Sequence, residues 1–159
     1  MQPIFRMVTL GIVLAVAFPV RLPAQPADPV SGTWELNLAK SKFSPGPPLK
    51  SQTRTYEFAG PNVKYTAKGI DAEGKPTLVQ YTATYDGKDY PMTGSADSDA
   101  ISLKRIDAVT VEFTQKKAGK VVITGTRVIS DGGKVMTVTS KGTNAKGQMI
   151  NNVLVLEKR

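Results

Sequence analysis

The sequence predicts an all-β protein, a single antiparallel up-and-down β-barrel (a β-clam) of about eight to ten strands. From residue 51 onward, runs of about seven to ten residues rich in Thr, Val, Tyr and Ile alternate with short turns. Apolar and polar side chains alternate within these runs, and no segment after the N-terminal apolar run has a sustained helical period. The short connections predict antiparallel neighbours, because a parallel pair needs a crossover of a dozen or more residues.

The N-terminal segment predicts export from the cell. Residues 1–24 begin with a charged stretch, continue with the apolar run MVTLGIVLAVAFPV and end in small residues, which is the pattern of a secretory signal peptide. This run is shorter than the roughly 20 residues that a membrane-spanning helix needs. Cleavage is expected after Ala24 or Ala27, so that residues 25–30 form a short linker and residues 31–159 the barrel domain. Because the chain has no cysteine, we expect a disulfide-free secreted or periplasmic protein of a bacterial envelope.

The first strand of the barrel is expected to start at Thr33 and to contain Trp34, the only tryptophan. A barrel needs one closed end, and we predict that Trp34 is a structural plug whose ring covers that end while its N–H meets a backbone acceptor. Gly32 is expected to let another backbone pass close by. Asn37 predicts a short helical turn over residues 38–43, and FSPGPPLK, residues 43–50, predicts an ordered crossing loop or a flexible flap.

Short turns separate the strands that follow. Within the strands, Tyr56 and Phe58 alternate with Glu57, for example. A meander of ten strands tends to curl until its two edges meet, and a barrel of that size has room for a small ligand. The alternative is a two-sheet sandwich, but sandwiches usually need Greek-key connections. The turns supply the Gly, Asn and Asp residues that tight hairpins need: AGPN (59–62), DAEGK (71–75), DGK (86–88), GSADSD (94–99), DA (107–108), AGK (118–120), DGGK (131–134) and NAKG (144–147).

Three stretches resemble a known group of barrels. GTW at residues 32–34, followed by ELN, is similar to the G-x-W opening of the calycin group, which contains the lipocalins and the fatty-acid-binding proteins. TGTRVISDGGKVMTVTSKG, residues 124–142, resembles the fatty-acid-binding pattern of a strand with an arginine, a D-G-K hairpin and a Thr-rich strand. VLEKR, residues 155–159, resembles that family's closing strand. The resemblance implies a lipocalin-like barrel, here a bacterial secreted member, with an internal site for an apolar molecule.

Arg127 is the first candidate ligand-binding residue. In the fatty-acid-binding family an arginine at the matching position reaches into the cavity and holds a carboxylate. The local pattern agrees, because Arg127 is a lone charge on a strand face that is otherwise apolar, and a buried guanidinium needs an anion or a ring of acceptors. The alternatives are an arginine at the rim and one paired with a core carboxylate. The other residues of this face are Val121, Ile123, Gly125 and Ile129.

The chain departs from the fatty-acid-binding pattern at two places. Leu154 and Leu156 stand where that family has the Arg-x-Tyr pair that completes carboxylate binding, and FSPGPPLK replaces its two-helix lid. The resemblance therefore implies a lipocalin-like binding protein without implying a fatty acid. Tyr81 and Tyr85 share a strand face with Val79 and Ala83, and we predict that they line the ligand cavity. The alternative is ordinary core packing.

The composition excludes most catalytic chemistry. Without His or Cys there is no Ser-His-Asp or Cys-His arrangement and no ordinary zinc, haem or thiolate site. The acidic residues lie mostly in turns, which does not suggest a glycosidase pair. Asp97 and Asp99 have the spacing that starts a calcium loop but lack its later ligands. We therefore expect a non-enzymatic protein without metal or cofactor.

The basic residues are concentrated in the last third of the chain. Residues 109–159 contain nine basic and three acidic side chains. Two hypotheses follow. The first is a monomeric carrier of a small apolar or amphipathic molecule, acidic if Arg127 contacts it. The second is a cell-envelope interaction module whose basic C-terminal strands bind an anionic polymer or membrane surface. Weak contact with an anionic surface is compatible with both, and nucleic acid is not an expected partner.

Overall fold

The computed structural model describes residues 27–159, which form ten strands and two short 3₁₀ turns. The predicted signal peptide lies outside the described residues. The strands are β1 (Gly32–Leu36), β2 (Ser51–Ala59), β3 (Asn62–Ile70), β4 (Pro76–Ala83), β5 (Asp86–Thr93), β6 (Ala100–Arg105), β7 (Thr110–Lys117), β8 (Lys120–Ser130), β9 (Val135–Thr143) and β10 (Met149–Lys158). The 3₁₀ turns are η1 (Leu38–Lys40) and η2 (Asp131–Gly133).

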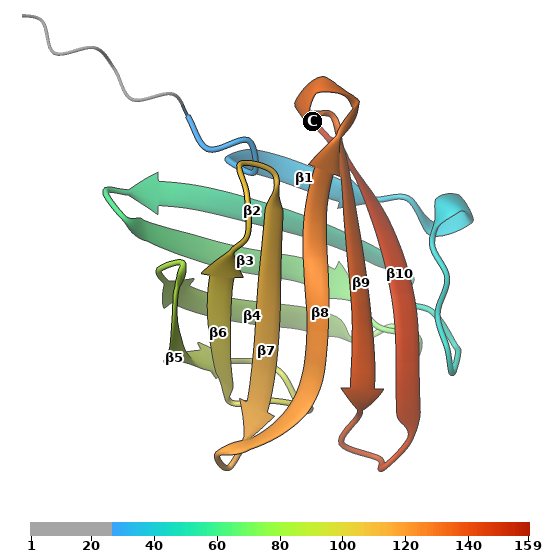
Figure 1. Cartoon of the computed structure of the whole chain (residues 1–159). Helices are drawn as coiled ribbons and strands as arrows, with labels where there is room; N and C mark the ends of the chain where they lie inside the picture. The colour runs from blue at the N-terminus through green and yellow to red at the C-terminus, as the bar shows by residue number, and fades with distance from the viewer. Residues whose placement is uncertain (1–26) are drawn as a thin grey trace, which may run out of the picture.

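The strands form one closed antiparallel barrel. Each strand pairs with its neighbours in the sequence, and β1 also pairs with β10, which closes the sheet. Figure 1 shows β2, β3 and β4 running across the molecule while β6 to β10 run upright beside them, so the barrel consists of two crossing layers. The predicted up-and-down barrel is confirmed. The sandwich alternative is wrong, because the first and last strands hydrogen-bond to each other.

One face of every strand points into the interior, as the period of two requires. On β2, β3 and β4 the inner row is aromatic: Tyr56 lies opposite Tyr65, and Tyr65 opposite Tyr81. All three rings are buried. The facing wall, from β6 to β10, is mainly aliphatic. Its most deeply buried members are Leu103, Met136 and Leu156.

The helical turn after β1 is shorter than the sequence predicts. Asn37 caps η1 as expected, since its Oδ1 accepts the N–H of Lys40 at 3.1 Å, but η1 ends at Lys40 rather than near residue 43. Lys42 instead exchanges two backbone hydrogen bonds with Val153 of β10, at 2.7 and 2.9 Å. Ser44 makes two further hydrogen bonds to β10. Pairing with β10 thus replaces the rest of the predicted turn and holds the start of the proline-rich loop.

Trp34 lies at the end of the barrel that the N-terminal segment covers. Its ring is fully buried, and its Nε1–H donates to the carbonyl of Val30 at 2.8 Å. The Lys158 ammonium lies 5.1 Å from the centre of the ring and donates to the carbonyl of Pro29 at 3.1 Å. These contacts tie residues 29 and 30 across this end.

Gly32 has a φ of +114°, a conformation that other residues rarely adopt. The close neighbour expected here was a backbone, but a Cβ at Gly32 would lie 3.2 Å from Cε of the Lys158 side chain. Backbone conformation is therefore the reason for glycine at this position.

Candidate functional site

The barrel contains a cavity of about 370 Å³, near the lower end of the size range of small-molecule sites. The cavity reaches the surface beside the loop of residues 43–49, where exposed Pro45 and Pro47 form part of its rim. The aromatic row of β2 to β4 lines one side and aliphatic side chains of β6 to β10 line the other. Polar side chains gather towards the mouth, namely Gln52, Ser95, Asp97, Gln115, Ser140, Asn144 and Asn152.

Arg127 lies on β8 between Val111 and Val138 of the adjacent strands and points into the cavity. Only 5% of the residue is exposed. Its Nη2 donates to the phenol oxygen of Tyr85 at 2.8 Å, and its Cζ lies 4.9 Å from the ring centre of Tyr56. Among the described residues no carboxylate lies within ion-pair distance of Arg127. The rim and carboxylate-paired alternatives therefore do not describe this side chain.

The pKa of Arg127 is raised above its ordinary value. Burial, the largest influence, lowers this pKa, but the surrounding phenols of Tyr56, Tyr85 and Tyr81 and the hydrogen bond to Tyr85 more than offset burial. The guanidinium is thus a buried cation whose close polar partners among the described residues are neutral phenols.

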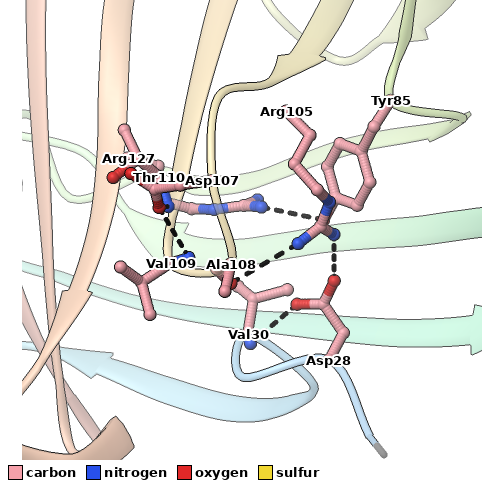
Figure 2. Close-up of polar contacts among 9 residues, drawn as sticks. All are labelled: Asp28, Val30, Tyr85, Arg105, Asp107, Ala108, Val109, Thr110 and Arg127. Atoms are coloured by element: carbon pink, nitrogen blue, oxygen red, sulfur yellow. Dashed lines mark hydrogen bonds and ion pairs between the residues drawn. The ribbon is translucent and has the colours of Figure 1, made fainter. Parts of the chain in front are cut away.

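Tyr85 is not among the residues that line the cavity. Figure 2 shows its phenol beside the guanidinium of Arg127, from which it accepts a hydrogen bond. The guanidinium of Arg105 stacks on its ring, with Cζ 4.1 Å from the centre. Arg105 in turn forms an ion pair with Asp28, whose other carboxylate oxygen accepts the N–H of Val30 at 3.0 Å. Burial raises the pKa of the Tyr85 phenol, and the charge of Arg127 opposes that rise. Tyr85 therefore positions Arg127 and connects it to the N-terminal segment.

Tyr81 lines the cavity as the sequence predicts, within a stack of rings. Its ring lies 4.5 Å from that of Tyr65 with an interplanar angle of 16°, and Tyr65 lies 5.1 Å from Tyr56. Burial raises the pKa of Tyr81 well above its usual value and that of Tyr65 to about 12. These phenols are neutral at pH 7 and present aromatic surface to the cavity.

Arg54 is a second interior cation, which the sequence analysis did not select. It lies on β2 between Trp34 and Ala67, is half-buried and lines the cavity. Its Nε donates to Oε1 of Gln52 at 2.7 Å. Burial lowers the pKa of Arg54, but the phenols of Tyr65 and Tyr56 more than offset this, so the guanidinium stays charged. The alternation of side chains along a strand indicates this position, because Arg54 is two residues before the buried Tyr56 and therefore lies on the same face of β2.

The last strand contributes no charge to the cavity. Leu154 and Leu156 are buried and face inward, at the places where the resemblance would put an arginine and a tyrosine. The second cation therefore comes from β2 rather than from β10.

The acidic residues at the mouth have structural partners. Asp97 accepts the N–H of Ala145 at 2.7 Å, which links the β5–β6 turn to the β9–β10 turn. Asp99 accepts the N–H of Ala118 at 2.9 Å. In residues 27–159 no three acidic side chains come together as a possible metal site. No helix in this part of the chain is long and apolar enough to cross a membrane.

Fold and site together define a class: a closed ten-strand antiparallel barrel, formed by residues 27–159, with an internal cavity. A scan of protein-family models and a search of curated proteins gave no match. Among solved structures, the chain is similar to a zebrafish ileal bile acid-binding protein complexed with cholic acid, with 12% identity, a TM-score of 0.48, and coverage of 82% of this chain and 99% of that one.

Two further solved structures are similar. One is EF1p2_mFAP2b bound to DFHBI, with 11% identity, a TM-score of 0.46, and coverage of 82% and 94% of the two chains. The other is mFAP1, a redesigned β-barrel bound to DFHBI, with 14% identity, a TM-score of 0.41, and coverage of 82% and 95%. The closed barrel of this chain is defined by its own strand pairing.

Proposed function

We propose that this chain is a secreted or periplasmic lipocalin-like carrier that binds a small amphipathic acid inside its barrel. The observation that supports this most strongly is Arg127, a buried cation that faces a cavity and whose close polar partners within residues 27–159 are phenols. The apolar walls take up the hydrophobic part of the ligand. Nothing in the described interior suggests a catalytic group, and the protein acts by binding alone.

The arrangement of the cavity suggests how the ligand is oriented. Arg127 and Tyr81 lie inside the barrel, whereas the amide side chains of Gln115 and Asn144 lie near the mouth. An anionic head group reaches Arg127 by passing into the barrel, where the low dielectric strengthens a charge-assisted hydrogen bond. The apolar part then occupies the space between the aromatic and aliphatic walls.

Replacing Arg127 tests the carrier directly. The probe is anilinonaphthalene sulfonate, an apolar anion whose fluorescence rises in apolar surroundings, and its affinity is measured by titration. Arg127→Leu should weaken binding at least tenfold, or about 1.4 kcal/mol, because the buried cation is lost. Arg159→Leu is the matched control, since Arg159 is exposed on the outside of the barrel. Equal affinities of the wild-type and Arg127→Leu chains, both folded by circular dichroism, would remove Arg127 from the site.

The surface near the mouth favours a second candidate function, adhesion to an anionic polymer or membrane. Val121 and Met149 are 58% and 75% exposed, and Lys120 and Lys146 near them are exposed too. Apolar and cationic side chains together suit an anionic surface. Salt distinguishes the two functions: adhesion to anionic vesicles should be lost between low and high ionic strength, whereas binding in the cavity should change little.

A further inference from the structure

The interior holds two guanidinium groups that face one cavity. Arg54 comes from β2 and Arg127 from β8, and both line the same space. Both cations lie close enough to Tyr65 to influence its phenol. Burial raises the pKa of Tyr65, and the charges of Arg54 and Arg127 each oppose that rise. Arg54 and Arg127 thus lie near one aromatic cluster, although they come from different layers of the barrel (Figure 1).

Neither cation has an anionic partner in the described chain. The side-chain hydrogen bonds of Arg54 and Arg127 go to Gln52 and Tyr85, both neutral, and no ion pair in residues 27–159 includes either arginine. Among the described residues that line the cavity, Asp97 is the one acidic residue, and it accepts a hydrogen bond from the N–H of Ala145 in a turn at the mouth. Two like charges in a poorly solvated space repel each other, and an anion between them relieves that repulsion.

We propose that the ligand carries two negative charges on one head group, as an alkyl phosphate monoester does, and that this group binds between Arg54 and Arg127. This inference rests on the proposed carrier function and makes the ligand class specific. A monocarboxylate compensates one guanidinium and leaves the other without an anion. A phosphate dianion has three acceptor oxygens and matches the planar fork of arginine with two hydrogen bonds, so it can serve both groups at once.

Three probes with the same decyl chain separate charge from shape. Decyl phosphate is a dianion at about pH 8, since phosphate monoesters have a second pKa of about 6. Decyl sulfate has the same tetrahedral shape with one charge, and decanoate has one charge on a planar head. Isothermal titration calorimetry, below the micelle concentrations, should show that the phosphate binds at least tenfold more tightly than either other probe.

The pH dependence gives an independent measurement. The chain has no histidine, so no side chain ordinarily titrates between about pH 5 and pH 8. Protonation of decyl phosphate to a monoanion across this range should therefore weaken its binding about tenfold. The affinity for decyl sulfate should stay constant.

Substitutions test whether Arg54 is the residue responsible for the preference for phosphate over sulfate. Arg54→Gln should abolish the preference for phosphate over sulfate, whereas Arg127→Gln should weaken all three probes. Arg54→Lys keeps the charge and should keep the preference, and it serves as the second variant if Arg54→Gln does not fold. The matched control is Arg159→Gln, which removes an exposed guanidinium paired with Glu35 and should change nothing.

Equal affinity for decyl phosphate and decyl sulfate would overturn this inference and leave a carrier of monoanions. A preference that survives Arg54→Gln would overturn it too. If none of the three probes binds to the wild-type chain, the carrier function itself fails together with the inference.

Discussion

Arg127 is a buried cation that packs against the rings of neighbouring tyrosines. Tyr56 and Tyr85 both offer ring faces to this guanidinium, at 4.9 and 5.7 Å from its Cζ, and Tyr85 also accepts its hydrogen bond. Partly desolvated cation–π contacts contribute roughly 0.5–2 kcal/mol each. Neutral phenols thus keep the cation in place without cancelling its charge, and the charge stays available to an anion.

The tyrosine cluster should make the fold sensitive to alkaline pH. Burial raises the pKa of Tyr65 to about 12, against about 10 in the unfolded chain. Because the unfolded chain loses this proton at a lower pH than the folded chain, the free energy of unfolding falls as pH rises from about 10 to about 12. Below about pH 10 the phenol is neutral in both states, and the full stability remains. Linkage puts the total on the order of 2–3 kcal/mol. Urea unfolding between about pH 8 and pH 11.5 should therefore show a falling free energy of unfolding, with a shallower fall in Tyr65→Phe. Parallel curves for the two chains would contradict this origin.

Among the elements, the β4–β5 pair is the weakest join in the wall of the barrel. Only two residue pairs connect these strands, Gln80 with Thr93 and Tyr81 with Met92, whereas eight pairs connect β3 and β4. The first half of β5 instead follows β6, with a register shift between Asp86 and Asp89. This segment is therefore held by fewer ladder hydrogen bonds than its neighbours.

Amide hydrogen exchange should show that the β4–β5 region opens more readily than the rest of the barrel. The amides of residues 84–89 should exchange at least tenfold faster than those of β3 and β8, because local opening there breaks few hydrogen bonds. Exchange at native pH, followed by two-dimensional NMR, measures each amide. Equal protection across β3, β8 and residues 84–89 would mean that the join opens only with the whole barrel.

The elements themselves were largely predictable, because they depend on local patterns. Alternation and turn chemistry predict the strands and the hairpins. On β8, Arg127 alternates in step with the apolar residues Ile123 and Ile129, which predicts that its side chain faces inward. Tyr85 was predicted to line the cavity, but β4 ends at Ala83, and alternation no longer applies beyond the end of a strand. Arg54 was missed because the polar residues Ser51 to Thr53 hide the alternation at the start of β2. The Arg105–Asp28 ion pair joins residues 77 positions apart, and no local pattern indicates such a contact.

At the scale of the whole molecule, the barrel is closed at one end and open at the other. Trp34 and Val30 cover the closed end, and Asp28 ties the N-terminal segment to Arg105 there. At the other end the cavity reaches the surface between turns that Asp97 partly links. Both interior cations, Arg54 and Arg127, line the cavity that opens at this end.

Native mass spectrometry of the protein purified from its own host tests the central claim most directly, because a carrier retains its ligand. The barrel should appear with an additional small molecule bound one to one, which organic extraction releases as an amphipathic acid. A ligand-free mass for the folded chain, with no uptake of decyl phosphate, decyl sulfate or decanoate, would contradict the account.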